Sequence, residues 1–169
     1  SDVYKRQFLG IEIPKQIVEE SFADISLPGR FEIISNEPLI ILDGAHNPPG
    51  ALAAAQTFQS SFNASGKRTL IVGMTEEKDA DWMLGNLNAS AFDSIITTEA
   101  PIPRSMSSNQ LAAVALDHCS DVVSHPNPEE ALLKALTSSS ENDIIFGTGS
   151  MYVVGALREA SLKLQSKQN

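Results

Sequence analysis

The sequence predicts an α/β fold, in which a mostly parallel sheet of about six strands carries helices on both faces. Short apolar segments alternate with longer segments in which apolar residues recur every three or four positions. The run Leu39–Leu42 is apolar at every position, as in a strand that is buried on both faces. Strands that alternate with helices are joined by crossover connections, and such connections produce parallel strands.

The first two strands are expected to form a hairpin. The apolar segments 31–35 and 39–42 are separated only by Asn36-Glu37-Pro38, which is a turn sequence and is too short for a crossover helix. The first strand should therefore run antiparallel to its neighbour.

The first helix is expected to begin after Asn47-Pro48, a helix cap followed by a proline at the first helical position. In each of the longer helical segments, apolar residues share one face: Ala51, Ala55, Phe58 and Phe62 in the first, Leu132, Ala135 and Leu136 in another, and Val153, Leu157, Ala160 and Leu164 in the last. The remaining strands are expected at 69–73, 94–98, 121–124 and 144–147, and the helices at 48–63, 79–87, 107–118, 128–137 and 150–164.

The first 29 residues do not continue this pattern. Segment 8–23 could form a short helix that is broken near Pro14, and 25–29 is expected to be a linker that ends in a Pro-Gly turn. Residues 1–7 (SDVYKRQ) fit nothing that follows, and we interpret them as an artificial remnant.

The composition is that of an ordinary globular domain. A chain of 169 residues with 42% hydrophobic and 20% charged residues suits one domain with a sizeable core. Its net charge of −9 argues against non-specific binding to nucleic acid or to anionic membranes. A single cysteine, Cys119, excludes an internal disulfide and fits a reducing compartment, and we find neither a signal peptide nor an apolar run long enough to span a bilayer. We therefore expect a cytoplasmic protein.

Polar residues near the ends of the first strands are candidates for a binding site. Arg30, after the Pro-Gly turn, could hold a phosphate group in a bidentate manner, whereas an arginine after a turn is more often a solvated surface residue. Asp43 could accept hydrogen bonds from ribose hydroxyls, or it could satisfy the backbone of its own turn. His46 could orient an amine or act as a general base, or it could be a structural loop histidine. All three would face a helix amino terminus, which attracts anions.

Later loops supply further candidates. Lys78 could neutralise a carboxylate, or it could belong to a solvated charge run with its acidic neighbours. Ser150 opens the last helix after Gly147-Thr148-Gly149, where free amides favour a carboxylate, although a plain serine cap needs the same residues. Arg104 lies on the stiff Pro-Ile-Pro-Arg loop and is either near the site or simply exposed. The histidines and Cys119 show no spacing typical of metal ligands.

The order and spacing of these residues resemble a known family. Two motifs, PGRFE and DGAHNP, follow each other with 13 positions from Arg30 to Asp43. This arrangement is similar to the carboxy-terminal domain of folylpolyglutamate synthase / dihydrofolate synthase, a branch of the Mur ligase superfamily. Further elements of that family are resembled, in the same order, by four later segments: Gly73-Met74, Glu77-Lys78-Asp79, Pro103-Arg104 and the final GSMYVVG. The resemblance covers roughly residues 8–165 and implies a Rossmann-like fold.

The resemblance also implies roles for the candidate residues. Arg30 and Asp43 would bind ATP, and His46, Ser150 and Lys78 would bind L-glutamate, with His46 as the catalytic residue. We further expect His46 and Ser150 to line one cleft on the same sheet edge as Asp43, because positions after strand ends in a parallel sheet share an edge.

By resemblance, the activity would be that of an ATP-dependent ligase. With ATP and Mg²⁺, such an enzyme activates a carboxylate of dihydropteroate or a folate as an acyl phosphate, which the amine of L-glutamate attacks. It could add the first glutamate, later ones, or both. Family members carry an amino-terminal ATPase domain with a P-loop, but no G-x-x-x-x-G-K-S/T occurs in this sequence. We therefore expect residues 1–29 to comprise the remnant, the end of an ATPase domain and a linker, and 30–169 to form the carboxy-terminal domain, inactive by itself.

Two other classes of function remain open from the sequence. The chain could belong to a different Mur-type ligase that joins another amino acid to another carboxylate, although the spelling of DGAHNP with PGRFE favours the folate branch. It could also be a non-catalytic α/β binding module.

Overall fold

The computed structural model describes residues 28–62 and 65–166. The helix expected at 8–23 and the interpretation of residues 1–7 lie outside these ranges. The elements follow one another as β1 (Glu32–Asn36), β2 (Leu39–Leu42), α3 (Pro48–Ser61), β3 (Arg68–Val72), α4 (Ala80–Asn86), the short 3-10 helix η1 (Ala89–Ala91), β4 (Ser94–Thr97), α5 (Ser108–Ala115), β5 (Val122–Ser124), α6 (Pro128–Thr137), β6 (Ile144–Thr148) and α7 (Met151–Ser166).

The strands form one six-stranded mixed sheet in the order β1-β2-β6-β3-β4-β5. Strand β1 is antiparallel to β2, and the other neighbouring pairs are parallel, so the predicted fold class is confirmed. Gly147 of β6 lies opposite Leu42 of β2 on one side and Ile71 of β3 on the other. The carboxyl ends of these three strands are therefore level, and the loops that leave them lie together.

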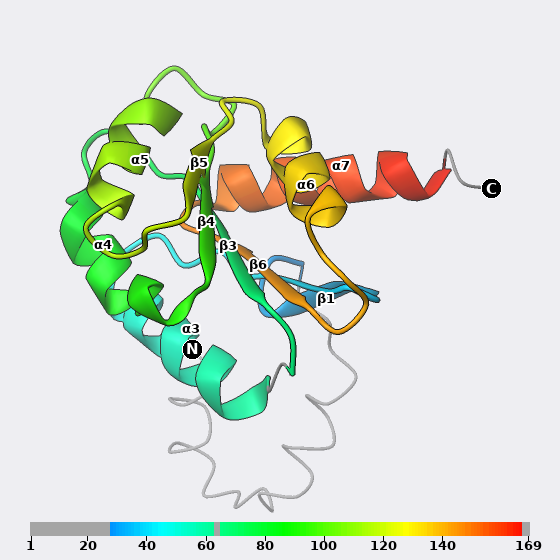
Figure 1. Cartoon of the computed structure of the whole chain (residues 1–169). Coiled ribbons are helices and arrows are strands. Elements are labelled where there is room, and N and C mark those ends of the chain that lie inside the picture. The colour runs from blue at the N-terminus through cyan, green and yellow to red at the C-terminus, as the bar shows by residue number, and fades with distance from the viewer. Residues whose placement is uncertain (1–27, 63–64, 167–169) are drawn as a thin grey trace, which may run out of the picture.

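Helices cover both faces of the sheet and enclose two cores (Figure 1). Helices α3, α4 and α5 pack on one face, where Phe58 lies against Phe146 with ring centroids 4.8 Å apart. Helices α6 and α7 cover the other face, where Leu132 and Leu157 are fully buried around Ile145. The apolar stripes predicted for these helices are the faces that the structure buries.

Most element ends lie within one or two residues of the prediction, and for two of the differences the structure gives a reason. Strand β1 begins at Glu32 rather than 31, because Phe31 has a φ of +44° and cannot belong to an extended strand. Helix α5 ends at Ala115 rather than 118, because the following amides of Asp117 and His118 donate to carbonyls three residues back and tighten the chain into a turn. The sequence pattern also did not predict η1.

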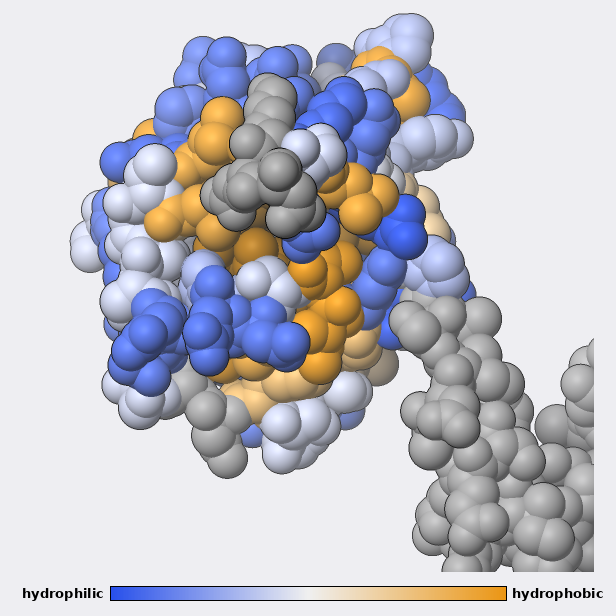
Figure 2. Space-filling model, turned by 90° about the vertical axis from the view of Figure 1, so that its right-hand side faces the viewer, coloured by the Kyte–Doolittle hydropathy of each residue, from blue (hydrophilic) through white to orange (hydrophobic). Residues whose placement is uncertain are grey.

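Helix α7 is fixed to the edge strand β1 by polar contacts. Arg158 Nε lies 2.8 Å from Glu32 Oε1, and Gln165 Nε2 donates to the Ile34 carbonyl at 3.2 Å. Figure 2 views this side of the molecule and shows a band of hydrophobic residues across it. The half-exposed Ile33 and Leu162 belong to these elements.

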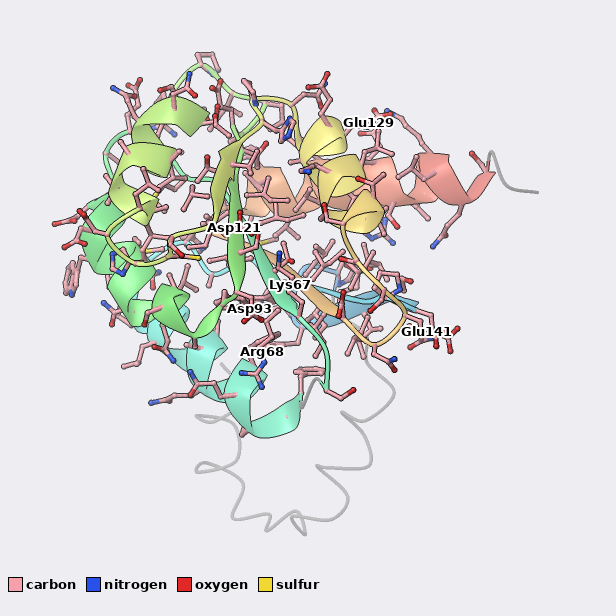
Figure 3. The ribbon with its side chains drawn as sticks, in the orientation of Figure 1. Lys67, Arg68, Asp93, Asp121, Glu129 and Glu141 are labelled. Atoms are coloured by element: carbon pink, nitrogen blue, oxygen red, sulfur yellow. The ribbon has the colours of Figure 1, made fainter. Side chains whose placement is uncertain are left out.

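Several charged residues at the amino-terminal ends of the strands close loops (Figure 3). Lys67 Nζ lies 3.1 Å from Asp121 Oδ2, and the Arg68 amide donates to Asp93 Oδ2 at 2.8 Å. Hydrogen bonds from the amides of Ser140 and Lys67 lower the pKa of Asp143. These charges serve the fold and lie at the sheet edge opposite to the candidate site.

Across 28–62 and 65–166, none of the helices combines the length and apolar character needed to cross a membrane.

Candidate functional site

The candidate residues gather at the carboxyl edge of the sheet, around two cavities that adjoin at His46. One cavity, of about 390 Å³, is lined by Arg30, Asp43 and His46 together with residues of α3; we call it the Arg30 cavity. The other, of about 230 Å³, contains Ser150 and is called the Ser150 cavity; it is lined by His46, Thr75, Glu77, Lys78, Arg104, Gly149, Ser150, Met151 and Tyr152.

Asp43 joins the two loops that carry Arg30 and His46. It is 7% exposed, and its two carboxylate oxygens accept the amides of Phe31 at 3.2 Å and Ala45 at 3.0 Å. Burial raises the pKa of Asp43, while these two hydrogen bonds and the nearby Arg30 charge offset part of the rise. Asp43 therefore satisfies backbone amides, including one in its own turn, which is the structural role considered for it from the sequence. Its role toward a nucleotide stays a prediction.

Arg30 is held out into its cavity by an unusual backbone. Gly29 and Phe31, on either side, both have positive φ values, of 71° and 44°. The Gly29 carbonyl accepts the Gly44 amide at 2.7 Å, which ties this turn to the end of β2. The Phe31 ring stacks on Phe146 and Phe62, with centroids 5.9 and 6.0 Å away. The turn is thus anchored on both sides of Arg30.

The helix side of the Arg30 cavity is built from small side chains. Gly50, Ala53, Ala54 and Thr57 of α3 line it, beneath the Asn47 cap that accepts the Gly50 amide at 2.9 Å. Because these side chains are short, the cavity leaves room for a flat group beside the Arg30 guanidinium. A basic group next to a helix amino terminus suits a phosphate ester.

Ser150 is buried and caps α7. Its Oγ accepts the Tyr152 amide at 3.2 Å, so the serine serves as a helix cap. Its hydroxyl hydrogen has no acceptor among the described residues and could be donated to a ligand. Gly149, just before it, has a φ of +101°, and a Cβ there would lie 2.5 Å from the Gly73 carbonyl oxygen. Only glycine fits this close approach of the β6 and β3 loops.

Arg104 reaches the Ser150 cavity because two loops pair with each other. Thr75, after β3, forms an antiparallel bridge with Ser105, after β4. The Glu76 amide donates to the Arg104 carbonyl at 2.9 Å. This pairing brings Arg104 beside the loop that carries Lys78, so the loop arginine lines the cavity instead of lying away from it.

His46 lies between the two cavities and has a defined hydrogen-bonding pattern. Its Nδ1 is 2.9 Å from the Gly44 carbonyl oxygen. A carbonyl can only accept, so Nδ1 carries the hydrogen, and in the neutral ring Nε2 is the free acceptor. The imidazole could therefore accept a proton through Nε2. His46 and Ser150 line one cavity on the Asp43 edge, which is the arrangement expected from the parallel sheet.

Sequence reasoning missed Glu77, Met151 and Tyr152 as lining residues and Phe31 as the support of Arg30. Met151 covers the backbone at Gly44, where an added Cβ would collide with its side chain, and at Gly29, where an added Cβ would lie 3.2 Å from its terminal methyl group. Met151 and Tyr152 could have been predicted as lining residues, because they directly follow the candidate residue Ser150 in the sequence. Within the described ranges, no group of three or more His, Cys, Asp or Glu side chains could hold a metal ion.

The sheet order and the paired cavities define the chain as a doubly wound α/β domain with its candidate site at the carboxyl edge of the strands. Residues 29–151 match the family described as "Mur ligase, glutamate ligase domain", and the chain belongs to this family. The resemblance inferred from the sequence motifs is thereby confirmed: this is a Mur ligase carboxy-terminal domain whose homologues are dihydrofolate and folylpolyglutamate synthases.

Curated relatives agree with this assignment. The chain is 30% identical over 154 residues to the dihydrofolate synthase/folylpolyglutamate synthase of Buchnera aphidicola, covering 91% of this chain and 36% of the relative. It is 31% identical over 148 residues to the folylpolyglutamate synthase of Lacticaseibacillus casei, covering 87% and 32%. The chain thus spans about a third of the length of these relatives.

Solved structures show the same correspondence. Mycobacterium tuberculosis folylpolyglutamate synthase complexed with ADP matches with a TM-score of 0.80 and 28% identity, over 92% of this chain and 37% of that one. The Yersinia pestis bifunctional folylpolyglutamate synthase/dihydrofolate synthase with Mn, AMPPNP and L-glutamate bound matches with a TM-score of 0.71 and 26% identity, over 92% and 36%.

Proposed function

We propose that this domain binds L-glutamate, and part of ATP, in an ATP-dependent ligase that joins glutamate to dihydropteroate or a folate. The observation that carries the proposal is the position of His46 between the Arg30 and Ser150 cavities. A ligase must hold an activated carboxylate and an incoming amine side by side, because most of its rate enhancement comes from positioning and charge stabilisation. Two adjoining cavities that share one proton acceptor suit this task.

The Arg30 cavity fits part of a nucleotide. Arg30 would hold a phosphate, and the short side chains of α3 leave space for a flat ring or sugar. Bound ATP supplies the phosphoryl group that activates the carboxylate. The Mycobacterium tuberculosis relative with ADP and the Yersinia pestis relative with AMPPNP support this assignment. The described residues contain no group of three or more His, Cys, Asp or Glu side chains that could hold a metal ion, and the motif resemblance implies that the Mg²⁺ ligands would come from an ATPase domain.

The Ser150 cavity fits L-glutamate. Lys78, Arg104 and the amino terminus of α7 would attract its carboxylates, and the Ser150 hydroxyl would donate to one of them. His46 would accept a proton from the amine through Nε2. The Yersinia pestis relative with L-glutamate bound supports this reading.

The test is to express the domain together with the reading frame that precedes Phe8 in its gene, and to measure ADP release. We expect release that requires L-glutamate together with dihydropteroate or a folate. Arg30→Ala should raise the KM for ATP, and Ser150→Ala the KM for glutamate, each about tenfold or more because a charge-assisted hydrogen bond is lost. Lys163→Ala, which alters an exposed residue far along α7, is the matched control and should leave both KM values unchanged.

The rival functions give different outcomes. ADP release with another amino acid or another carboxylate, but not with glutamate and a pteroate, would identify a different Mur-type ligase. No ADP release with any such pair would indicate a non-catalytic binding module. Wild-type kinetics for Arg30→Ala and Ser150→Ala would refute the assignment of the two cavities.

A further inference from the structure

The Ser150 cavity contains a carboxylate among its cations. Glu77 lines the cavity together with Lys78 and Arg104. A cavity that served only to attract an anion would gain nothing from this carboxylate, because a like charge repels the ligand. The proposed attraction of the glutamate carboxylates therefore leaves Glu77 without a role toward the ligand.

The local structure keeps Glu77 in place and ionised. Its loop is paired with the Arg104 loop through the Thr75–Ser105 bridge and the Glu76 amide. Hydrogen bonds from its own amide and from the Thr75 side chain, together with the charges of Arg104 and Lys78, lower the pKa of Glu77. The carboxylate is therefore charged at neutral pH and is a weak base.

The charges of the cavity complement those of an amino acid with an acidic side chain. L-glutamate has two carboxylates and one ammonium group. The cavity offers two cations and a helix amino terminus for the carboxylates, and one carboxylate that could face the ammonium. Among the residues that line the cavity, Glu77 is the only one with a negative charge.

We propose that Glu77 binds the α-ammonium group of the incoming amino acid and so selects a zwitterion over a plain dicarboxylate. The inference rests on the proposed function of the Ser150 cavity. Glu77 is a binding residue here and not the base. The ammonium nitrogen passes one proton to His46 Nε2, the free acceptor at the cavity boundary, and thereby regains the lone pair that the reaction needs.

The test compares L-glutamate with glutarate, which has both carboxylates but lacks the amine. Binding of each compound to the 169-residue chain is followed by NMR chemical-shift titration of the wild type, Glu77→Gln, Glu77→Asp and Glu76→Gln. Glu76 is the matched control, because it is an adjacent glutamate that is exposed like Glu77, is absent from the cavity lining, and uses its backbone in the loop pairing.

We expect the wild type to prefer L-glutamate over glutarate by about tenfold or more, as for a charge-assisted hydrogen bond. Glu77→Gln should abolish this preference by weakening L-glutamate binding while leaving glutarate binding equal or stronger. Glu77→Asp should retain part of the preference, and Glu76→Gln all of it. Retained glutarate binding shows that the cavity of Glu77→Gln is still folded.

The outcomes separate this inference from the proposed function. If Glu77→Gln strengthens the binding of both compounds, or leaves the preference intact, Glu77 is only a repulsive or neutral neighbour and the inference is overturned while the glutamate site stands. If L-glutamate causes no shifts around the Ser150 cavity in the wild type, the glutamate site and the inference fail together.

Discussion

Phe31 holds a backbone conformation that is unfavourable for a residue with a Cβ, and its neighbours keep it there. Its φ is +44°, its amide donates to the buried Asp43, and its ring stacks on Phe146. Strain of this kind persists only where the surroundings stabilise it, and it is often found at functional sites. Here the strained residue directly follows Arg30, so it determines the direction in which the arginine leaves the turn.

Replacing Phe31 by glycine should be less harmful than replacing it by alanine. Both variants lose the stacked ring, but only alanine retains the left-handed strain, which costs about 1 kcal/mol or more. Urea denaturation should therefore find Phe31→Gly more stable than Phe31→Ala. The control is the same pair of substitutions at Ile33, an exposed β1 position without a positive φ. There the alanine variant should be more stable than the glycine variant. An alanine variant that is at least as stable as the glycine variant at position 31 would contradict the strain.

Asp43 should affect stability as well as ligand binding. Its two oxygens accept the amides of Phe31 and Ala45, and Asp43→Ala would remove the partner of a part-buried donor at Phe31 and of a buried donor at Ala45. We expect a loss of about 1–3 kcal/mol in the free energy of unfolding. Arg30→Ala, at an exposed position, should leave that free energy nearly unchanged. Thermal unfolding of the two variants side by side checks this, and equal stability would show that the Asp43 hydrogen bonds are dispensable.

At the scale of elements, the sheet and its last helix meet at the ion pair between Glu32 of β1 and Arg158 of α7. Glu32 is 9% exposed, whereas the Arg158 side chain is 44% exposed. Burial alone would raise the pKa of Glu32, but hydrogen bonds from Arg158 and the Gly29 amide outweigh it and hold the pKa below its ordinary value. The pair links the edge of the sheet to the helix whose amino terminus forms the Ser150 cavity.

Arg158→Met should destabilise the domain by about 1 kcal/mol at pH 7, because it leaves a buried carboxylate without its cation, while solvent near the arginine limits the loss. A lowered folded-state pKa means that the stabilisation from Glu32 is complete above its unfolded pKa and is lost as the pH falls through the folded value. The difference between wild type and variant should therefore shrink in acid. Urea denaturation at pH 7 and near pH 3 measures this. Lys163→Met removes an exposed pair with Glu159 on the same helix. Lys163 lowers the pKa of Glu159, so a difference of the same sign is expected, but it should be much smaller because solvent screens both side chains.

At the scale of the whole molecule, the sheet order brings together loops that are far apart in the sequence. Strand β6 lies between β2 and β3, so the loop that starts at Asp43, the loop that contains Lys78 and the turn that contains Ser150 share one edge. The Arg30 and Ser150 cavities both open there. By contrast, the P-loop that the motif resemblance implies for the triphosphate has no counterpart among the 169 residues.

The 169-residue chain should therefore have no ATP-dependent ligase activity by itself, even though both cavities are formed. The expected result is no ADP release above background when ATP, Mg²⁺, L-glutamate and dihydropteroate are added to the purified chain. The activity of the longer polypeptide under the same conditions is the positive control. Substrate-dependent ADP release by the chain alone would show that it carries its own phosphate-binding machinery.

The sequence by itself determined the fold class, the order of the elements and the family. These depend on local information: apolar periodicity distinguishes strands from helices, the Asn47-Pro48 cap marks the start of a helix, and the short turn at 36–38 requires a hairpin. The candidate residues Arg30, Asp43, His46, Lys78 and Ser150 could also be chosen from the sequence, because each lies near a predicted strand end or helix start.

Only the tertiary structure decided how these residues are grouped and which others join them. It divided the candidates between two cavities with His46 at the boundary, brought Arg104 and Glu77 together through loop pairing, and engaged both oxygens of Asp43 with backbone amides. It also revealed the positive φ of Phe31, a residue type that ordinarily avoids this conformation. These features could not be read from the sequence, because they depend on which strands become neighbours and on contacts between segments that local periodicity does not specify.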